Sequence, residues 1–279
     1  MNINLQHYQE QYIQYVKKQE IDKELKKKFI EILIEKKIAK RKEMWNSIRI
    51  PLNQIKFLHN LANPFYIGFG NPESDILFIG KEKAFNITNN PESFLDESIN
   101  NLLDWEKSNE KDEFSFNPKN PYLFYNTKYK HKIKGRETWG FYKNITQKII
   151  SKNENNIELK DNTFFNYCFT TEINHIPSKK TLNKKLINQR LDFLQKEDFF
   201  KSFKHVIIGA KGSVSKEEIK HIFGKSPIET SIILGNNKRT TFSVDVFEYE
   251  NQKIILCNQL SGATGWTNEV LENLIETIN

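Results

Sequence analysis

Apolar positions recur along this chain in two different patterns. From residue 8 to about residue 46 they return at helical intervals among many Lys and Glu, with no Pro or Gly, up to Pro51. This spacing predicts one long helix or two shorter ones. From residue 75 onwards, short continuous apolar runs alternate with segments of helical period. Such runs are typical of strands that are buried on both faces of a sheet.

The alternation defines the expected elements. Apolar runs predict strands at 75–80, 164–171, 205–209, 242–249 and 253–257, and helical patterns predict helices at 138–150, 182–194, 215–223 and 268–278. Strands that alternate with helices favour an α/β fold, a three-layer α/β/α sandwich with a mainly parallel central sheet.

The same pattern divides the chain into two regions. We predict an N-terminal helical extension at residues 1–52, packed on or projecting from an α/β domain at residues 53–279. The protein is expected to be a monomer, unless the N-terminal helices serve as an oligomerisation or partner arm. Between residues 86 and 135 the chain is polar and loop-like with scattered aromatic side chains, which indicates a lid or an insertion.

In an open parallel sheet, ligands bind beyond the carboxyl ends of the strands. This rule singles out the segments that follow Gly80, Phe169, Gly209 and Cys257. We therefore expect the functional residues at these four strand ends.

Composition bears on the partner and the compartment. The 42 Lys and Arg against 35 Asp and Glu give a net charge of +7, which permits binding to nucleic acid, although a lysine-rich proteome explains the surplus equally well. Cys168 and Cys257 lie in apolar runs outside any Cys or His cluster, so we expect buried thiols, no metal site and no cofactor. No export signal and no apolar run long enough to span a membrane are visible, which favours a cytoplasmic protein without a membrane partner.

Five segments occur in an order that resembles the uracil-DNA glycosylase superfamily. The segment 69–80, FGNPESDILFIG, resembles the first motif of that superfamily, a G-N-P phrase followed by an apolar strand that ends in Gly before the catalytic loop. The other four segments are 136–142, 165–171, 206–209 and 254–262, which resemble a helix start, the second and third core strands, and the last strand with its leaving-group loop. The resemblance covers roughly residues 63–279 and leaves the N-terminal helices outside it.

The resemblance implies a hydrolase, a monofunctional DNA glycosylase that needs no cofactor. Such an enzyme cleaves the N-glycosidic bond of uracil or another modified base that has been flipped out of DNA. The reaction needs a group that positions water, donors that stabilise the departing base, and a surface that holds the base. The setting would be DNA repair or phage defence.

Glu82 is the expected catalytic carboxylate. In one branch of the superfamily the acid occupies this position, and in another it stands one place earlier, where this chain has Lys81. Gly80 and Lys81 are expected to line the substrate site, and Phe85 to stack on the extruded base. The alternatives are that Glu82 pairs with a neighbouring lysine in solvent and that Phe85 anchors the loop in the core.

Asn166 is the expected base-reading residue. Its amide stands in the middle of an apolar run, where burial is costly unless a partner satisfies it, and its donors and acceptor suit a pyrimidine edge. The alternative is an amide bonded to neighbouring backbone. His175 is expected to be a surface loop residue, and no role is assigned to it.

The last motif departs most from the superfamily. Many relatives place a His where the departing base develops charge, whereas the segment 256–262, LCNQLSG, has none. Asn258 is expected to supply a neutral donor, with Ser261 beside it, as in relatives that read N-P-S-G; the alternative for Asn258 is a turn residue. The missing His leaves a second hypothesis open, a nucleic-acid-binding module that keeps the base pocket but is catalytically weak or inactive.

Basic segments at residues 126–136, 178–185 and 236–239 are expected to hold DNA, single- or double-stranded. Residues 126–136 contain five cations and an interleaved Tyr, which suits a surface that follows a phosphate backbone. Solvated loops are the competing interpretation. The expected DNA-binding residues are Lys128, Lys130, Lys132, Lys134, Arg136, Lys179 and Lys180.

Overall fold

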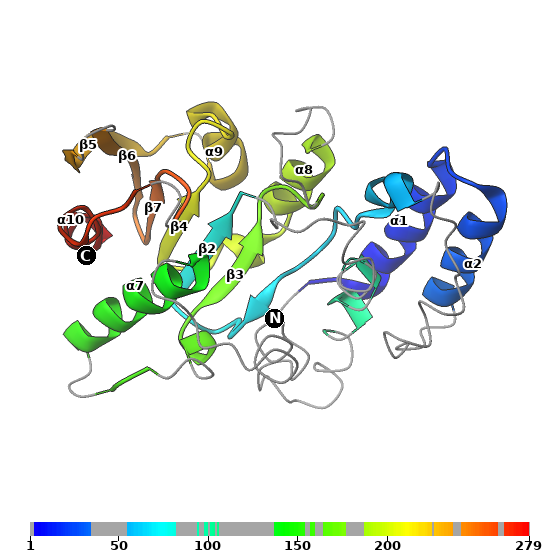
Figure 1. Cartoon of the computed structure of the whole chain (residues 1–279), viewed down its shortest axis with the longest axis horizontal. Coiled ribbons are helices and arrows are strands. Elements are labelled where there is room, and N and C mark those ends of the chain that lie inside the picture. Colours follow the sequence, from blue (N-terminus) through cyan, green and yellow to red (C-terminus); the bar gives the residue numbers. More distant parts are fainter. Residues whose placement is uncertain are drawn as a thin grey trace.

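The chain folds around a seven-stranded mixed sheet with helices packed against it (Figure 1). The computed structural model describes residues 3–34, 55–81, 94, 98–99, 101–103, 105, 137–153, 157–159, 164–176, 187–224, 226–236, 241–261 and 265–278. The helices are α1 (Leu5–Lys18), α2 (Lys23–Ile34), α7 (Thr138–Asn153), α8 (Asn188–Lys196), α9 (Lys216–Phe223) and α10 (Asn268–Ile278), with 3-10 helices η1 (Ile55–Leu61), η3 (Phe164–Asn166) and η5 (Asp198–Lys201). The strands are β1 (Phe69–Gly70), β2 (Ile76–Gly80), β3 (Phe169–Glu172), β4 (His205–Gly209), β5 (Ile228–Asn236), β6 (Thr241–Tyr249) and β7 (Gln252–Leu256).

The sheet has the order β1-β3-β2-β4-β7-β6-β5. Strands β3, β2, β4 and β7 run parallel, whereas β1, β6 and β5 pair antiparallel to their neighbours. The α/β fold is confirmed and the sheet is mixed, with parallel and antiparallel strand pairs in equal number, so a mainly parallel sheet is not confirmed. The reason is the short connection from β6 to β7, residues 250–251, since a parallel crossover needs about a dozen residues.

Alternate residues of β2 enter two separate hydrophobic clusters. Ile76 and Phe78 pack with side chains of α7 and α10, and the ring of Phe78 stacks on Tyr142 of α7 at 4.2 Å between centroids. Leu77 and Ile79 pack with side chains of α8 and α9 instead. Helices therefore lie on both sides of β2.

The N-terminal helices pack on the remainder of the chain. The rings of Tyr8 and of Phe193 in α8 form a T-shaped pair at 4.7 Å between centroids, and the Tyr12 hydroxyl donates to the Leu61 carbonyl oxygen at 2.5 Å. Tyr8, Tyr12 and Val16 recur four residues apart and form the buried stripe of α1. The described part of the predicted helical region, up to residue 34, thus forms two shorter helices, which pack on the core at the far end from β5 and α10 (Figure 1).

Most predicted elements are confirmed, and the start of the second strand is wrong. The segment predicted as one strand at 164–171 begins as the 3-10 helix η3, and β3 starts only at Phe169. The backbone N–H of Asn71 donates to the carbonyl oxygens of Phe165 and Cys168, at 2.9 and 3.1 Å. These bonds hold the segment before β3 in a turn, so that Asn166 is exposed instead of lying within a strand.

Candidate functional site

The parallel strands β3, β2, β4 and β7 end at one edge of the sheet. In the strand register Gly80 lies beside Glu172 on one side and beside Gly209 on the other. We call the last residues of these strands and the residues directly after them the carboxyl edge. It comprises residues 172–176, 80–81, 209–211 and 256–261. Polar side chains gather here, as expected for the ligand-binding end of parallel strands.

Strand pairing between β2 and β3 continues past the strand ends. The N–H of Ile173 donates to the Gly80 carbonyl oxygen at 2.8 Å, and the N–H of Asn174 donates to that of Lys81 at 3.0 Å. The buried Asn174 side chain accepts a hydrogen bond from the N–H of Ile176 at 3.0 Å. The residues after β3 are therefore fixed beside the residues after β2.

Glu172 directs its carboxylate onto Gly80. A Cβ atom added at Gly80 would lie 2.2 Å from Oε2 of Glu172, so the absence of a side chain at Gly80 makes room for the carboxyl group. On the α7 side, burial raises the pKa of Tyr142, and the nearby charge of Glu172 raises it further. A carboxylate thus lies at the end of β2, on the α7 face of the sheet.

Arg190 of α8 holds the end of β3 from the other face. Its guanidinium is fully buried and donates to the carbonyl oxygens of Glu172 at 2.9 Å and Pro64 at 3.2 Å, to that of Tyr66, and to the Thr171 hydroxyl at 2.6 Å. Burial lowers the pKa of Arg190 to about 9, so the group remains charged at neutral pH. The charged fork fixes the position of the last residues of β3.

His175 is held at the same edge as a neutral imidazole. Burial, and then the charge of Arg190, lowers its pKa to about 3. Both ring nitrogens are buried, and neither has a hydrogen-bond partner among the residues that the structure describes. His175 lies outside any helix or strand, and its side chain is half-buried, with both ring nitrogens turned away from water.

The β7 side of the carboxyl edge carries Asn258 and Ser261. The Lys211 N–H donates to the Cys257 carbonyl oxygen at 2.9 Å, which places the loop after β4 beside Asn258. The N–H of Ser261 donates to the Gln259 carbonyl oxygen at 2.9 Å, and the same oxygen accepts from the Trp266 indole at 3.0 Å. Both predicted residues are partly exposed at this edge.

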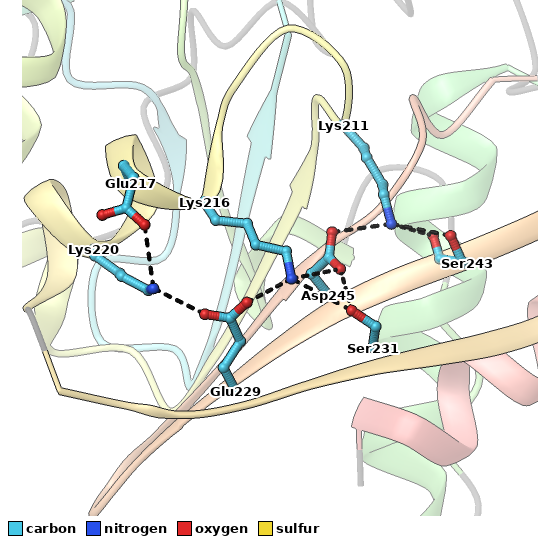
Figure 2. Close-up of polar contacts among 8 residues, drawn as sticks. All are labelled: Lys211, Lys216, Glu217, Lys220, Glu229, Ser231, Ser243 and Asp245. Atoms are coloured by element: carbon cyan, nitrogen blue, oxygen red, sulfur yellow. Dashed lines mark hydrogen bonds and ion pairs between the residues drawn. The ribbon is translucent and has the colours of Figure 1, made fainter.

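A network of alternating charges continues from Lys211 across β6 and β5 to α9 (Figure 2). The Asp245 carboxylate, 8% exposed, lies between the ammonium groups of Lys211 at 3.0 Å and Lys216 at 3.3 Å, and it accepts from Ser231 at 2.6 Å. Burial raises the pKa of Asp245, but hydrogen bonds from Ser231 and Lys211 outweigh burial and hold it below its usual value. Glu229 extends the network from Lys216 to Lys220.

This network links elements and offers no nucleophile. The Lys211 ammonium donates to the Ser243 hydroxyl at 3.0 Å, an arrangement that activates a serine only where the amine is neutral. The Lys211 ammonium is instead held in an ion pair with Asp245 at 3.0 Å. We therefore assign the network to joining α9 and the loop after β4 to the β5–β6 pair.

The structure brings four predicted site residues to the carboxyl edge and places Asn166 away from them. Gly80, Lys81, Asn258 and Ser261 lie at the carboxyl edge. Asn166 lies at the opposite end, where its carbonyl oxygen accepts from the Asn71 amide before β2 begins, and the length of β2 separates it from Gly80 by about 13 Å. The predicted residues outside the described part are Glu82, Phe85, Lys128, Lys130, Lys132, Lys134, Arg136, Lys179 and Lys180.

The Gly70-Asn71 phrase belongs to the segment that resembles the uracil-DNA glycosylase superfamily. It forms a turn at the amino end of β2. A Cβ atom on Gly70 would lie 2.2 Å from the Cys168 carbonyl oxygen, so only glycine allows β1 to approach this turn. The Asn71 side chain accepts from the N–H of Glu73 at 2.9 Å and donates to the Asn166 carbonyl oxygen at 2.8 Å. The presence of Gly70 and Asn71 is therefore explained by the turn that they form.

Three edge residues were missed from the sequence: Glu172, Asn174 and His175. The signal was the cluster of polar residues after the apolar run that ends at Phe169, but placing the strand too early drew attention to Asn166 instead. A boundary error of a few residues moves the chemistry from one end of a strand to the other.

Both cysteines are free and buried, as predicted, and burial raises the pKa of each thiol to about 12. In the described part of the chain, no group of three or more His, Cys, Asp and Glu can hold a metal ion. None of the described helices is both long and apolar enough to cross a membrane.

We compared the chain with family models, with curated proteins and with solved structures, and none of them matches it.

Proposed function

We propose that the chain is a DNA glycosylase-like enzyme, which hydrolyses the N-glycosidic bond of uracil or another modified base flipped out of DNA. The supporting observation is the carboxyl edge, where a carboxylate, a neutral imidazole and side-chain amides gather at the ends of four parallel strands. The proposal includes a three-layer α/β/α architecture around these strands. The net charge of +7 suits a DNA partner.

Two carboxylates are candidates for orienting water. The Glu172 carboxylate lies against Gly80, at the strand end where the extruded nucleotide would enter. A carboxylate in this position would orient water towards the sugar and face the positive charge that develops there. Glu82 follows Lys81 directly and keeps the same role as a prediction.

The departing base needs donors on the opposite side of the cleaved bond. Asn258 and Ser261, beyond the end of β7, are the candidates, because both side chains can donate to the developing anion. A neutral amide stabilises an anion less than a positioned imidazole does. We therefore expect slow excision.

The test uses oligonucleotides that carry uracil or other modified bases, followed by alkaline cleavage at abasic sites. The variants are Glu172→Gln and Glu82→Gln, and the control is Glu73→Gln, an exposed carboxylate at the opposite end of β2. We expect base release by the wild type and the control, and a loss of about a hundredfold or more in the variant that removes the catalytic carboxylate. If the wild type cleaves the strands no more than both variants do, for every base in a broad panel, the proposed glycosylase activity is refuted.

The second candidate is a base-binding module that performs no chemistry. It is favoured by Lys211, whose backbone N–H pairs with Cys257 beside Asn258, because its ammonium is held by Asp245 and is not directed to a departing base. This candidate predicts DNA binding that weakens as salt rises, without release of a base. A binding titration at several salt concentrations, run beside the cleavage assay, separates the two candidates.

A further inference from the structure

The two edges of the sheet differ in how they are closed. At the β1 edge, the Asn101 side chain accepts from the N–H of Ile67 at 2.7 Å and donates to the Gly68 carbonyl oxygen at 3.0 Å. The Trp105 indole donates to the same oxygen at 3.0 Å. The other edge is β5, which pairs with β6 on one side and, within the described part of the chain, with no strand on the other (Figure 1). Its outward backbone groups are therefore open to a further strand.

Strand β5 lacks the features that usually keep the edges of sheets apart. Natural edge strands are short or carry lysine and proline within them. Strand β5 has nine residues without lysine, arginine or proline, and its exposed side chains include Ile228 at 71% and Ile233 at 70% exposure. A bulge follows Ile233, so the regular part of the open edge is 228–233. An open apolar edge of this length is suited to pairing with a strand of another molecule.

The sequence of β5 is complementary to itself in one antiparallel register. When two copies are related by a two-fold axis beside Thr230, this threonine lies opposite Thr230 of the second copy. Ile228 then lies opposite Ile232, and Ile233 lies opposite Pro227, which directly precedes β5. Each of the two exposed isoleucines thus gains an apolar partner, and such cross-strand pairs stabilise a sheet. The pairs end at Ile233, before the bulge.

Charge does not oppose this register. Glu229 is the only charged residue of β5, and its carboxylate is paired with the ammonium groups of Lys216 and Lys220 in α9 (Figure 2). In the register centred on Thr230, Glu229 lies opposite Ser231 of the second copy, so that like charges do not face each other. The pairing therefore requires no charged group to lose its partner.

We propose that the chain forms a two-fold symmetric dimer, in which β5 of one copy pairs antiparallel with β5 of the second copy and joins the two sheets into one. The dimer takes the place of the monomer expected from the sequence. It does not use the N-terminal helices, which pack at the far end of the molecule from β5 (Figure 1). It is also independent of the proposed function.

The first experiment measures the mass of the full chain by sedimentation velocity. Protein is examined from about 1 μM to about 200 μM, at physiological salt, which screens the net charge of +7 that each copy carries. We expect a monomer at the lowest concentration and a dimer at the highest. The variants Ile228→Lys and Ile233→Lys, each tested alone, should raise the dissociation constant of the dimer about tenfold or more, because each places a charge within the paired edge.

Ile34→Lys is the matched control, because Ile34 is 61% exposed at the end of α2 and lies outside β5. It should leave the dissociation constant unchanged. All three variants should keep the far-UV circular dichroism of the wild type, since the replaced side chains are exposed in the single copy. A wild type that remains monomeric throughout would overturn the proposal. An effect of Ile34→Lys as large as that of Ile233→Lys would also overturn it, because the interface would then not be β5.

The second experiment tests the register with engineered cysteines. In Thr230→Cys the two new Cβ atoms would lie about 5 Å apart across the axis, close enough for a disulfide to form with little movement. Both native cysteines are buried and do not interfere. Asn236→Cys is the control, because this exposed residue lies at the carboxyl end of β5, far from the axis. Oxidised glutathione should cross-link two chains in Thr230→Cys alone. Absence of a cross-link at position 230, or equal cross-linking at both positions, would overturn the proposed pairing.

Discussion

The guanidinium of Arg190 donates from Nε to the carbonyl oxygen of Glu172 at 2.9 Å, and this bond ties α8 to the last residue of β3. The same group reaches the Thr171 hydroxyl and the carbonyl oxygens of Pro64 and Tyr66. One buried charge thus joins the chain before β1, the end of β3 and α8. The candidate site depends on this fixed end of β3, because Glu172, Asn174 and His175 follow from it.

Replacement of Arg190 with Met is expected to destabilise the fold. The apolar side chain fills similar space but leaves three carbonyl oxygens and a hydroxyl without their donor, which costs about 3 to 5 kcal/mol in the free energy of unfolding. Denaturant unfolding measures the loss. Lys196→Met, an exposed cation on the same helix, is the control and should change stability by no more than about 0.5 kcal/mol. Equal effects of the two substitutions would contradict the role of Arg190.

Gly80→Ala tests the contact between β2 and the Glu172 carboxylate. The added Cβ would lie 2.2 Å from Oε2 and 2.9 Å from Cδ of Glu172, so the carboxyl group has to move. Since a flexible side chain can give way, the fold should survive, at a cost of about 1 to 3 kcal/mol. Under the proposed function, base release should fall more than stability does.

Gly209→Ala is the matched control for Gly80→Ala. Gly209 lies beside Gly80 in the sheet, but its added Cβ would meet nothing nearer than the Leu260 nitrogen at 3.4 Å, which is ordinary contact. Melting temperature and base release should change little. If both variants lose activity to the same extent, the position of the Glu172 carboxylate is not what the reaction needs.

The sequence predicted the buried elements well, for a physical reason. Continuous apolar runs such as 76–80 and 205–209 enter the hydrophobic clusters on both faces of the sheet. The apolar pattern in the sequence therefore matches the burial of these strands. Strand β5 was missed because it is an edge strand that leaves Ile228 and Ile233 about 70% exposed, with mostly exposed neighbours, and shows no clean alternation. An edge strand is held by backbone pairing with β6, which leaves little mark in the sequence.

The candidate site was predicted by place but only partly by residue. The rule for parallel strands led to Gly80, Lys81 and Asn258 at the carboxyl edge. His175 was missed because burial of a polar side chain depends on tertiary packing, which no local pattern records. Asn166 was chosen because an amide within an apolar run looked buried, whereas bonds from the Asn71 N–H hold that run in a turn.

Gly70→Ala tests whether the Gly-Asn turn has a structural function. Gly70 has φ +111° and a backbone oxygen 2.2 Å from the added Cβ, whereas Gly212 has φ +86° and nothing within 4 Å. Gly212→Ala should cost about 1 to 2 kcal/mol from backbone strain alone. Gly70→Ala should cost several kcal/mol more, because backbone atoms cannot move aside as side chains do. Similar unfolding free energies for the two variants would show that the close approach of β1 is unimportant.

Asp245→Asn is expected to lower stability in a pH-dependent manner. The charged carboxylate accepts from Ser231 and from two ammonium groups, so its replacement at pH 7 should cost about 1 to 3 kcal/mol. The pKa of Asp245 in the folded protein lies below its ordinary value of 3.8. The stability that it contributes is therefore fully present above about pH 5 and is lost as the pH falls below about 4.

The difference between wild type and Asp245→Asn should thus shrink in acid. Melting temperatures measured from pH 7 to pH 3 should converge at the acidic end, since the wild-type carboxyl group becomes neutral there, like the amide. Asp198→Asn is the control, because its carboxylate pairs with Lys201 at 94% exposure and solvent screens such a pair. It should follow the wild type throughout. A constant difference across the range for Asp245→Asn would mean that the carboxylate stabilises the β5–β6 pair through shape and hydrogen bonding, with no contribution from its charge.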